Sequence, residues 1–156
     1  MPIIRPSLDD DILAITAIYA HHVLNSTGTF ETEAPSAQDM TTRRADVLGK
    51  GLPYLVAVDC EKIVGFAYGN WFKPRPAYRY SVEDSIYLAP DQQGKGLGRA
   101  LLAELMARCE AAGIRKMMAI VGRQVLIKNK PQTIIPKLIG IHLAPQRIGN
   151  IPELFF

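Results

Sequence analysis

The 156-residue sequence has few cysteines and no long apolar run. Its two cysteines, Cys60 and Cys109, lie far apart and form no CxxC pattern, which excludes a disulfide scaffold and a cysteine-based zinc site. No stretch approaches the roughly 20 apolar residues that a membrane span requires. The N-terminus, MPIIRPSLDDD, turns acidic where a signal peptide would be hydrophobic. We therefore expect a cytoplasmic protein with no membrane partner.

An excess of charge is also missing. The 18 Lys and Arg residues are nearly balanced by 15 Asp and Glu residues, and the net charge is +3. Nucleic-acid-binding proteins usually gather basic residues on one face or arm, and no such run occurs, so we expect no nucleic-acid partner. A small basic excess also suits a polyanionic nucleotide cofactor. The hydrophobic content of 48%, with 12 Gly and 11 Pro, is typical of one globular domain.

Two helices are predicted in the first third of the chain. The first follows Ser7, the expected N-cap, and ends at His21 and His22, whose charge suits a helix C-terminus without any chemistry. The second follows Ser36, another expected N-cap, with Asp39 three positions later. A short edge strand is expected before the first helix.

Strands and one further helix follow. Apolar runs at 54–58 and 63–69 predict a hairpin, and 82–88 predicts a third strand. The clearest helix is expected over 98–112, with Gly113 at the C′ position, followed by a strand over 116–121. After Gly122, prolines and lysines interrupt the isoleucines, and only short strands near 125–127 and 134–135 are expected.

A glycine-rich loop at 93–99 carries the strongest chemical signal. It follows a strand and opens a helix, which directs backbone N–H groups and the helix dipole toward one spot suited to phosphate. A side chain in place of a glycine would block the phosphate oxygens, while Lys95 and Arg99 would add charge. The spacing fits neither a Walker A loop nor a Rossmann fingerprint. A merely flexible loop is the alternative.

The residues Gln93-x-x-Gly96-x-Gly98 resemble the pyrophosphate loop of the GNAT acetyltransferases, Q/R-x-x-G-x-G/A. Residues 78–88, Thr29-Phe30-Glu31 and Gly69-Asn70-Trp71 resemble the phosphinothricin N-acetyltransferase group of that superfamily. The resemblance covers about residues 2–122. It implies an α/β (α+β) fold of the GNAT type, with a mixed, mostly antiparallel central sheet flanked by helices. It further implies one domain over 1–156, family-like to 122 and divergent over 123–156, which forms a homodimer.

The same resemblance implies an N-acetyltransferase that uses acetyl-CoA as co-substrate and no metal. Its acceptor would be the free amine of a small amino-acid-like molecule such as phosphinothricin, methionine sulfoximine or methionine sulfone. The expected cofactor-binding residues are Ile86, Tyr87, Leu88, Gln93, Gly94, Lys95, Gly96, Leu97, Gly98 and Arg99. The expected substrate-binding residues are Phe30, Arg75, Pro76, Ala77 and Tyr78.

Acetyl transfer to an amine requires a base for the ammonium proton, donors for the oxyanion and protection of the leaving thiolate. Glu83 matches the position of the family's catalytic glutamate and is the expected base. The alternative is a purely structural role for Glu83, in an ion pair with Arg79 or Lys73. Asp84 would point to the other face of the strand and is expected to be structural. The backbone N–H of Leu88 is the expected oxyanion donor.

Two side chains of the aromatic and arginine-rich loop at 71–80 have competing interpretations. Arg75 would anchor a substrate carboxylate, or it would be a solvated loop residue. Trp71 is expected to be core, although Phe30, Trp71 and Tyr78 together would also line an apolar pocket.

The sequence departs from its family after residue 122. The Asn-x-x-Ser segment, the short helix with a His or Tyr, and Leu-Gly-Phe are not recognisable there. A frameshift, a divergent tail or an uncertain sequence would each explain the change, and a missing helix would leave an exposed sheet edge. The alternative function is a non-catalytic acyl-CoA-binding remnant. Peptide acetylation fits less well, because aromatic loops like 71–80 close small-molecule clefts.

Overall fold

The computed structural model describes residues 2–26, 29, 31–125 and 133–142, and only the backbone of 121–125 and 133–142. Its helices are α1 Ile12–Asn25, α2 Ala37–Gly49 and α3 Leu97–Ala111. Its strands are β1 Ile3–Pro6, β2 Tyr54–Asp59, β3 Lys62–Trp71, β4 Ser81–Leu88, β5 Lys116–Val125 and β6 Thr133–His142. Single turns of 3-10 helix are η1 Asp9–Asp11, η2 Pro76–Tyr78 and η3 Pro90–Gln92. None of the described helices is long and apolar enough to cross a membrane.

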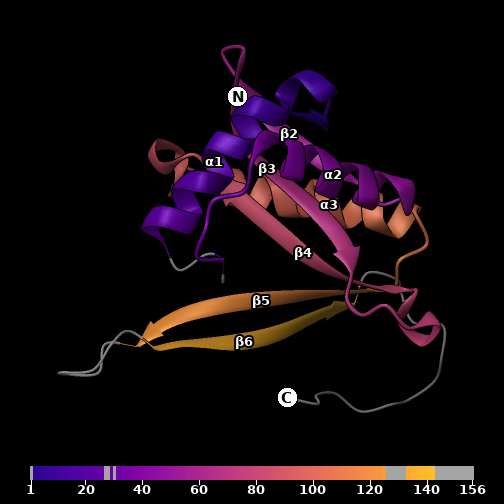
Figure 1. Ribbon diagram of the computed structural model, residues 1–156. Helices are drawn as coiled ribbons and strands as arrows, with labels where there is room; N and C mark the ends of the chain where they lie inside the picture. The colour runs from indigo at the N-terminus through magenta and orange to yellow at the C-terminus, as the bar shows by residue number, and fades with distance from the viewer. Residues whose placement is uncertain (1, 27–28, 30, 126–132, 143–156) are drawn as a thin grey trace.

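The strands form one sheet in the order β1-β2-β3-β4-β5-β6. Every neighbouring pair is antiparallel except β4 and β5, which are parallel. Helices α1 and α2 lie on one face of the sheet, and α3 lies on the other (Figure 1). The expected mixed, mostly antiparallel sheet flanked by helices is therefore confirmed.

The sheet opens between its two parallel strands. The pairing of β4 with β5 ends at Asp84 and Ala119, although both strands continue beyond these residues. Beyond this point β4 stays paired only with β3, and β5 only with β6. Figure 1 shows β4 and β5 close together at one end and diverging toward the other. The divergence leaves part of the β4 backbone without a strand on that side.

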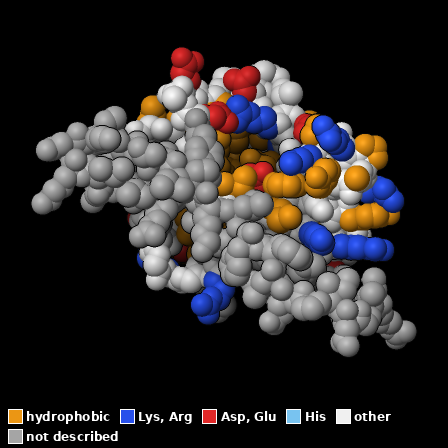
Figure 2. Space-filling model, turned by 90° about the horizontal axis from the view of Figure 1, so that it is seen from below, with side chains coloured by type: hydrophobic (Ala, Val, Ile, Leu, Met, Phe, Trp, Pro, Cys, Tyr) orange, Lys and Arg blue, Asp and Glu red, His pale blue; other side chains and the backbone are white. Residues whose placement is uncertain are grey.

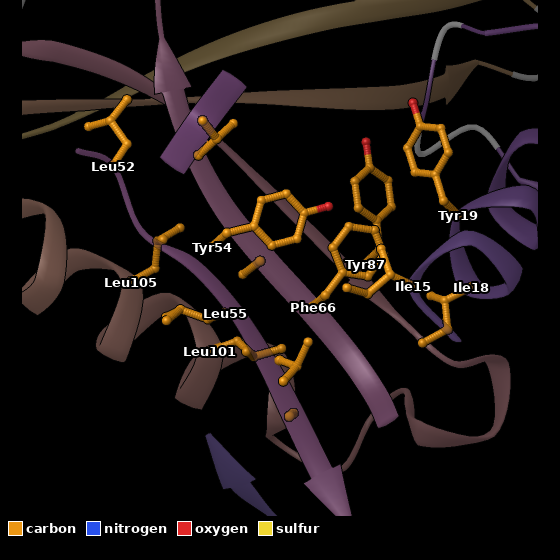
Figure 3. Packing of buried hydrophobic residues seen from close by; sticks show 14 of the residues in the cluster. Ile15, Ile18, Tyr19, Leu52, Tyr54, Leu55, Phe66, Tyr87, Leu101 and Leu105 are labelled. Atoms are coloured by element: carbon orange, nitrogen blue, oxygen red, sulfur yellow. The ribbon is translucent and has the colours of Figure 1, made fainter. Parts of the chain in front are cut away.

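Side chains alternate across the strands and build two core layers. Under α1 and α2 lies an aromatic cluster in which Tyr54 stacks on Tyr68 at 4.8 Å, and Phe66 stacks on Tyr87 at 5.2 Å. The opposite layer packs Leu101 and Leu105 of α3 against the sheet, both fully buried. Figure 3 shows the two groups on either side of β3. Burying each such leucine stabilises the fold by about 1.5–3 kcal/mol.

Of the two serines expected to cap helices, Ser36 caps α2 and Ser7 does not cap α1. Ser36 and Asp39 form the expected reciprocal cap of α2. Ser7 does not cap α1, because its hydroxyl accepts a hydrogen bond from the buried Arg44 at 2.7 Å. Asp11 provides the capping acceptor at the start of this segment instead, because its carboxylate accepts a hydrogen bond from the Leu8 N–H at 2.7 Å. The need of a buried guanidinium for partners outweighs local capping here.

The end of the described chain differs from the expectation. Helix α3 ends at Ala111, and Gly113 has the predicted left-handed conformation, with φ of +84°. Strand β5 extends to Val125. The strand expected near 134–135 is confirmed, but it is longer than expected, because β6 is a ten-residue strand paired with β5. Its Pro136 lacks an N–H to donate, which an edge strand tolerates. Residues 126–127 lie outside the described residues.

Candidate functional site

A cavity of about 370 Å³ lies where β4 and β5 diverge. Its lining comes from α1 (Tyr19), β3 (Tyr68), residues 83–87 of β4 and residues 119–120 of β5, together with Thr29 and Glu31. Figure 2 shows a hollow with a hydrophobic floor, and acidic and basic side chains near its edge. Glu31 and Glu83 are acidic side chains of this lining, and no lining residue is basic. The cavity is therefore complementary to a cationic group such as an ammonium.

Glu83 lines this cavity from the strand face covered by α1 and α2. It stands opposite Asn70 of β3, and its carboxylate has no hydrogen-bond or ion-pair partner among the described residues. Burial, and secondarily the charge of Asp84, raise the pKa of Glu83. The alternative pairing is not found, because Arg79 bonds the Pro76 carbonyl and Lys73 lies over the rings of Phe72 and Tyr78.

Asp84 points to the opposite face of the strand, as expected. Val82, two residues earlier on the same face, lies against the α3 layer, as does Gly69 across the ladder. One Asp84 carboxylate oxygen is buried without a partner among the described residues. Burial raises the pKa of Asp84, and its charge adds to the burial that raises the pKa of the Cys109 thiol to about 12. The two adjacent carboxylates therefore serve different layers of the fold.

The backbone of β4 presents free groups to the gap. Hydrogen bonds from the Phe72 N–H to the Ser81 carbonyl and from the Ala89 N–H to the Val64 carbonyl show that odd-numbered residues bond to β3. By the alternation of an antiparallel ladder, Ile86 and Leu88 direct their N–H and C=O groups away from β3, toward the gap. Tyr87 instead directs its backbone to β3 and its ring into the aromatic cluster. Of the three expected residues, Ile86 and Leu88 are suited to backbone contacts with a ligand.

His22 has a role that the sequence did not reveal. Its Nε2 lies 2.8 Å from the Leu88 carbonyl oxygen and must donate to it, and its ring packs 5.4 Å from Tyr87. The side chain is buried, whereas a position at the end of a helix indicated only a favourable charge. His22 thereby ties α1 to the end of β4, sixty-six residues later. No local signal in the sequence could indicate so distant a partner.

The glycine-rich loop ends in the first turn of α3. Gly94 and Gly96 have φ of +75° and +81°, and an added Cβ would meet nothing within 4 Å at either position. Within the protein, glycine is therefore required there by backbone conformation rather than by crowding. Gly96 is the N-cap of α3 and offers no side-chain cap. The first N–H to bond back belongs to Ala100, so the N–H groups of 97–99 have no partner among the described residues.

The expected substrate loop does not reach the cavity. Arg75, Pro76 and Ala77 are exposed, and Tyr78 packs on Phe72 at 6.0 Å between ring centroids. None of these residues lines the cavity of Glu83. Arg75 has no ion pair among the described residues, as its solvated alternative predicted. Phe30 lies outside the described residues.

Trp71 is 44% exposed, so its expected place in the core was wrong. It ends β3 at the surface, where the Lys50 ammonium lies 5.2 Å from its ring. A tryptophan in a strand-like run usually indicates burial, but the last residue of a strand can project beyond the layer of helices.

Glu31 is a cavity residue that sequence reasoning did not assign. Its carboxylate accepts from the Arg43 guanidinium at 2.7 Å and from the Tyr19 hydroxyl at 2.8 Å. The Arg43 bonds hold the pKa of Glu31 below its usual value. The network joins α1, α2 and the segment between them, and it keeps one carboxylate ionised beside the less acidic Glu83. No cluster of three potential metal-ligating side chains occurs in the part of the chain that the structure describes.

Comparisons with known proteins agree with this geometry. Residues 15–129 match the acetyltransferase (GNAT) family. The chain is 51% identical over 119 residues to a phosphinothricin N-acetyltransferase of Alcaligenes faecalis, covering 76% of this chain and 60% of that protein. It is 40% identical over 116 residues to an L-methionine sulfoximine/L-methionine sulfone acetyltransferase of Pseudomonas aeruginosa, covering 71% of this chain and 65% of that protein.

A solved structure of an acetyltransferase has a similar fold. The phosphinothricin acetyltransferase of Sinorhizobium meliloti, crystallised with AcCoA, superposes with a TM-score of 0.75 at 45% identity, covering 77% of this chain and 65% of that one. The chain thus spans somewhat less than two thirds of the length of these relatives. Within that span, the diverging parallel strands and the glycine-rich helix start lie inside the matched region. The chain belongs to the GNAT acetyltransferase family.

Proposed function

We propose that this chain transfers the acetyl group of acetyl-CoA to the free amine of a small amino-acid-like substrate of the phosphinothricin, methionine sulfoximine or methionine sulfone type, with Glu83 as general base. The observation that carries the proposal is an unpaired, desolvated Glu83 in an acidic cavity at the divergence of β4 and β5. The names of the relatives from Alcaligenes and Pseudomonas support the substrate class.

The residues present fit acetyl-CoA. Unpartnered N–H groups at the start of α3, with the positive end of its dipole, suit a pyrophosphate, and Gln93, Gly94, Lys95 and Arg99 lie around them. The free backbone N–H and C=O groups of Ile86 suit the amide groups of a pantetheine arm. When bound, acetyl-CoA supplies an activated thioester carbonyl and a thiolate leaving group. No metal is needed for this chemistry.

Glu83 would perform the proton transfer. Its carboxylate takes a proton from the substrate ammonium, directly or through one water, and the freed nitrogen lone pair then attacks the acetyl carbonyl. The Leu88 N–H, aimed into the gap, donates to the oxygen that gains negative charge. His22 holds the Leu88 carbonyl and so fixes the neighbouring peptide groups at the end of β4. Glu31 stays ionised through Arg43, which leaves Glu83 as the acidic side chain of the cavity without a partner among the described residues.

The substrate-binding roles of Phe30, Arg75, Pro76, Ala77 and Tyr78 stay predictions. Arg75 would anchor a carboxylate only if its loop, or a second copy of the chain, brought it to the cavity. The homodimer, the single domain over 1–156 and the cytoplasmic location are likewise predictions that a single chain does not test.

A non-catalytic acyl-CoA-binding remnant is the second candidate, favoured by the departure of the sequence from its family after residue 122. A calorimetric titration with acetyl-CoA, followed by a thiol-release assay with methionine sulfoximine, methionine sulfone and phosphinothricin, separates the two. Binding with amine-dependent thiol release supports the acetyltransferase. Binding without release across the panel supports the remnant, and no binding contradicts both.

A further inference from the structure

A second cavity of about 380 Å³ lies beneath α2 on the same face of the sheet as Glu83. Its uncharged lining includes Met40 and Val47 of α2, Tyr54 of β2, and Tyr68 and Asn70 of β3. Its charged lining residues are Arg43 and Asp46. Tyr19 and Tyr68 line both cavities. Asn70 of the second cavity is also the cross-strand partner of Glu83 in the first. The two cavities therefore adjoin, and an elongated molecule with its amine at Glu83 could extend into the second.

Nearly all polar side chains around this second cavity already have partners. Arg43 is paired with Glu31 at 2.7 Å, and Asp46 with Lys50 at 2.6 Å. The Asn70 side-chain oxygen accepts from the Lys50 ammonium at 3.0 Å and from the Trp71 N–H at 2.8 Å. The charges are thus neutralised within the protein, and the walls offer mainly aromatic and aliphatic surface.

Tyr54 is the exception. Its side chain is 2% exposed, and its hydroxyl is buried without a hydrogen-bond partner among the described residues. A buried hydroxyl without a partner is costly and is normally satisfied by an acceptor. Figure 3 shows the Tyr54 ring beside Phe66, and stacking on Phe66 at 6.0 Å and on Tyr68 at 4.8 Å restricts its rotation toward another acceptor. Tyr54 lines the cavity, and its hydroxyl is a buried donor without a partner among the described residues.

We propose that this second cavity binds the distal end of the acceptor substrate, and that Tyr54 donates a hydrogen bond to an uncharged oxygen there, such as that of a sulfone or sulfoximine. The inference rests on the proposed function, since it names which acceptors the same site prefers. An uncharged end is favoured because Arg43 and Asp46 are each already neutralised. The apolar walls accommodate the methyl group and the methylene chain of such a substrate.

The test compares methionine sulfone with methionine, which has the same chain and lacks the two oxygens. In the unaltered chain we expect a higher kcat/KM for the sulfone. Tyr54→Phe removes only the hydroxyl, and it should lower kcat/KM for the sulfone by roughly fivefold to tenfold while changing that for methionine by less than about twofold. The exposed Tyr80 gives a matched control, because Tyr80→Phe should leave the ratio of the two substrates unchanged.

Equal effects on both substrates, or none on the sulfone, would overturn the proposal while leaving the acetyltransferase function intact. The melting temperature of Tyr54→Phe should not fall, because the variant removes an unpaired buried group. If the chain turns over no amine, calorimetric binding of methionine sulfone decides the question. Weaker binding to Tyr54→Phe than to the unaltered chain would support the site, and equal binding or none would refute it.

Discussion

Two neighbouring carboxylates, Glu83 and Asp84, show how a strand divides chemistry between its faces. Glu83 faces the layer under α1 and α2, beside Asn70 and the cavity. Asp84 faces the α3 layer, near Cys109. Both have raised pKa values because burial disfavours the charged form. Their similar chemistry therefore leads to different expectations on substitution.

Replacing Glu83 by Gln should remove the base and keep the shape of the side chain. We expect kcat to fall by about 10²–10⁴-fold, with little change in acetyl-CoA affinity. In the unaltered chain, kcat/KM should rise with pH through the raised pKa of Glu83, because only the ionised carboxylate accepts a proton. Steady-state kinetics across pH and a calorimetric titration measure both. An equal loss of turnover and affinity, or an unchanged acid limb in the variant, would contradict the assignment.

Asp84→Asn should affect stability in a pH-dependent way. A carboxyl with a raised pKa in the folded state keeps its proton longer than in the unfolded state, so stability is lost as pH rises from its unfolded pKa through its folded pKa. The variant lacks this loss. Its free energy of unfolding, relative to the unaltered chain, should increase over this range by on the order of 1 kcal/mol and then level off.

Urea unfolding at several pH values measures this difference. Asp11 and Glu31 have lowered pKa values, so their contribution acts in the opposite sense and is lost as pH falls. Because both remain in the variant, their contributions cancel in the comparison. A difference that does not vary with pH would show that Asp84 is not desolvated in the folded state.

At the scale of elements, the start of α3 combines a backbone conformation with a free set of N–H groups. Gly96→Ala places a side chain at φ of +81°, which strains the turn and displaces those N–H groups. We expect acetyl-CoA affinity to fall by about tenfold or more. Gly51→Ala is the matched control, because it places a side chain at a similar φ of +71° outside this loop. Calorimetry that finds equal affinity in both variants would disprove the pyrophosphate assignment.

The link between α1 and β4 gives another expectation at this scale. His22→Ala removes the donor to the Leu88 carbonyl and frees the end of β4. We expect KM for acetyl-CoA to rise by roughly fivefold, since the adjacent backbone groups lose their fixed direction. His22→Gln can restore a donor and should recover part of the loss. His21→Ala, at the neighbouring position of the same helix, should behave like the unaltered chain; equal effects of the two alanine variants would reduce His22 to a helix-stability role.

Local signals in the sequence predicted elements better than they predicted partners. The cap at Ser36, the apolar stripe of α3 and Gly113 each act within a few residues, so pattern alone was enough. Ser7, His22 and Tyr54 depend on residues far away in the chain or on an adjoining cavity, and no periodicity records that. Glu83 was predicted only through resemblance, because an acid inside a strand has many structural explanations. The cavity that Glu83 lines lies where two strands separate, which is a property of the assembled sheet.

At the scale of the whole molecule, β6 completes the described sheet on the side of β5. It pairs along the full length of β5 and becomes the edge of the sheet among the described residues. The chain spans 60% of the length of its Alcaligenes relative, yet the cavity, the free β4 backbone and the loop before α3 all lie within the described part. The groups proposed to take the ammonium proton, hold the oxyanion and bind the pyrophosphate therefore belong to one connected region.

The measurement that tests this account most directly is mass-spectrometric detection of the N-acetylated product when the 156-residue chain is incubated with acetyl-CoA and methionine sulfone or phosphinothricin. The account predicts product that accumulates in proportion to enzyme and is nearly abolished by Glu83→Gln. Binding of acetyl-CoA without any acetylated amine would contradict it, and would leave a cofactor-binding protein in which Glu83 has no substrate to deprotonate.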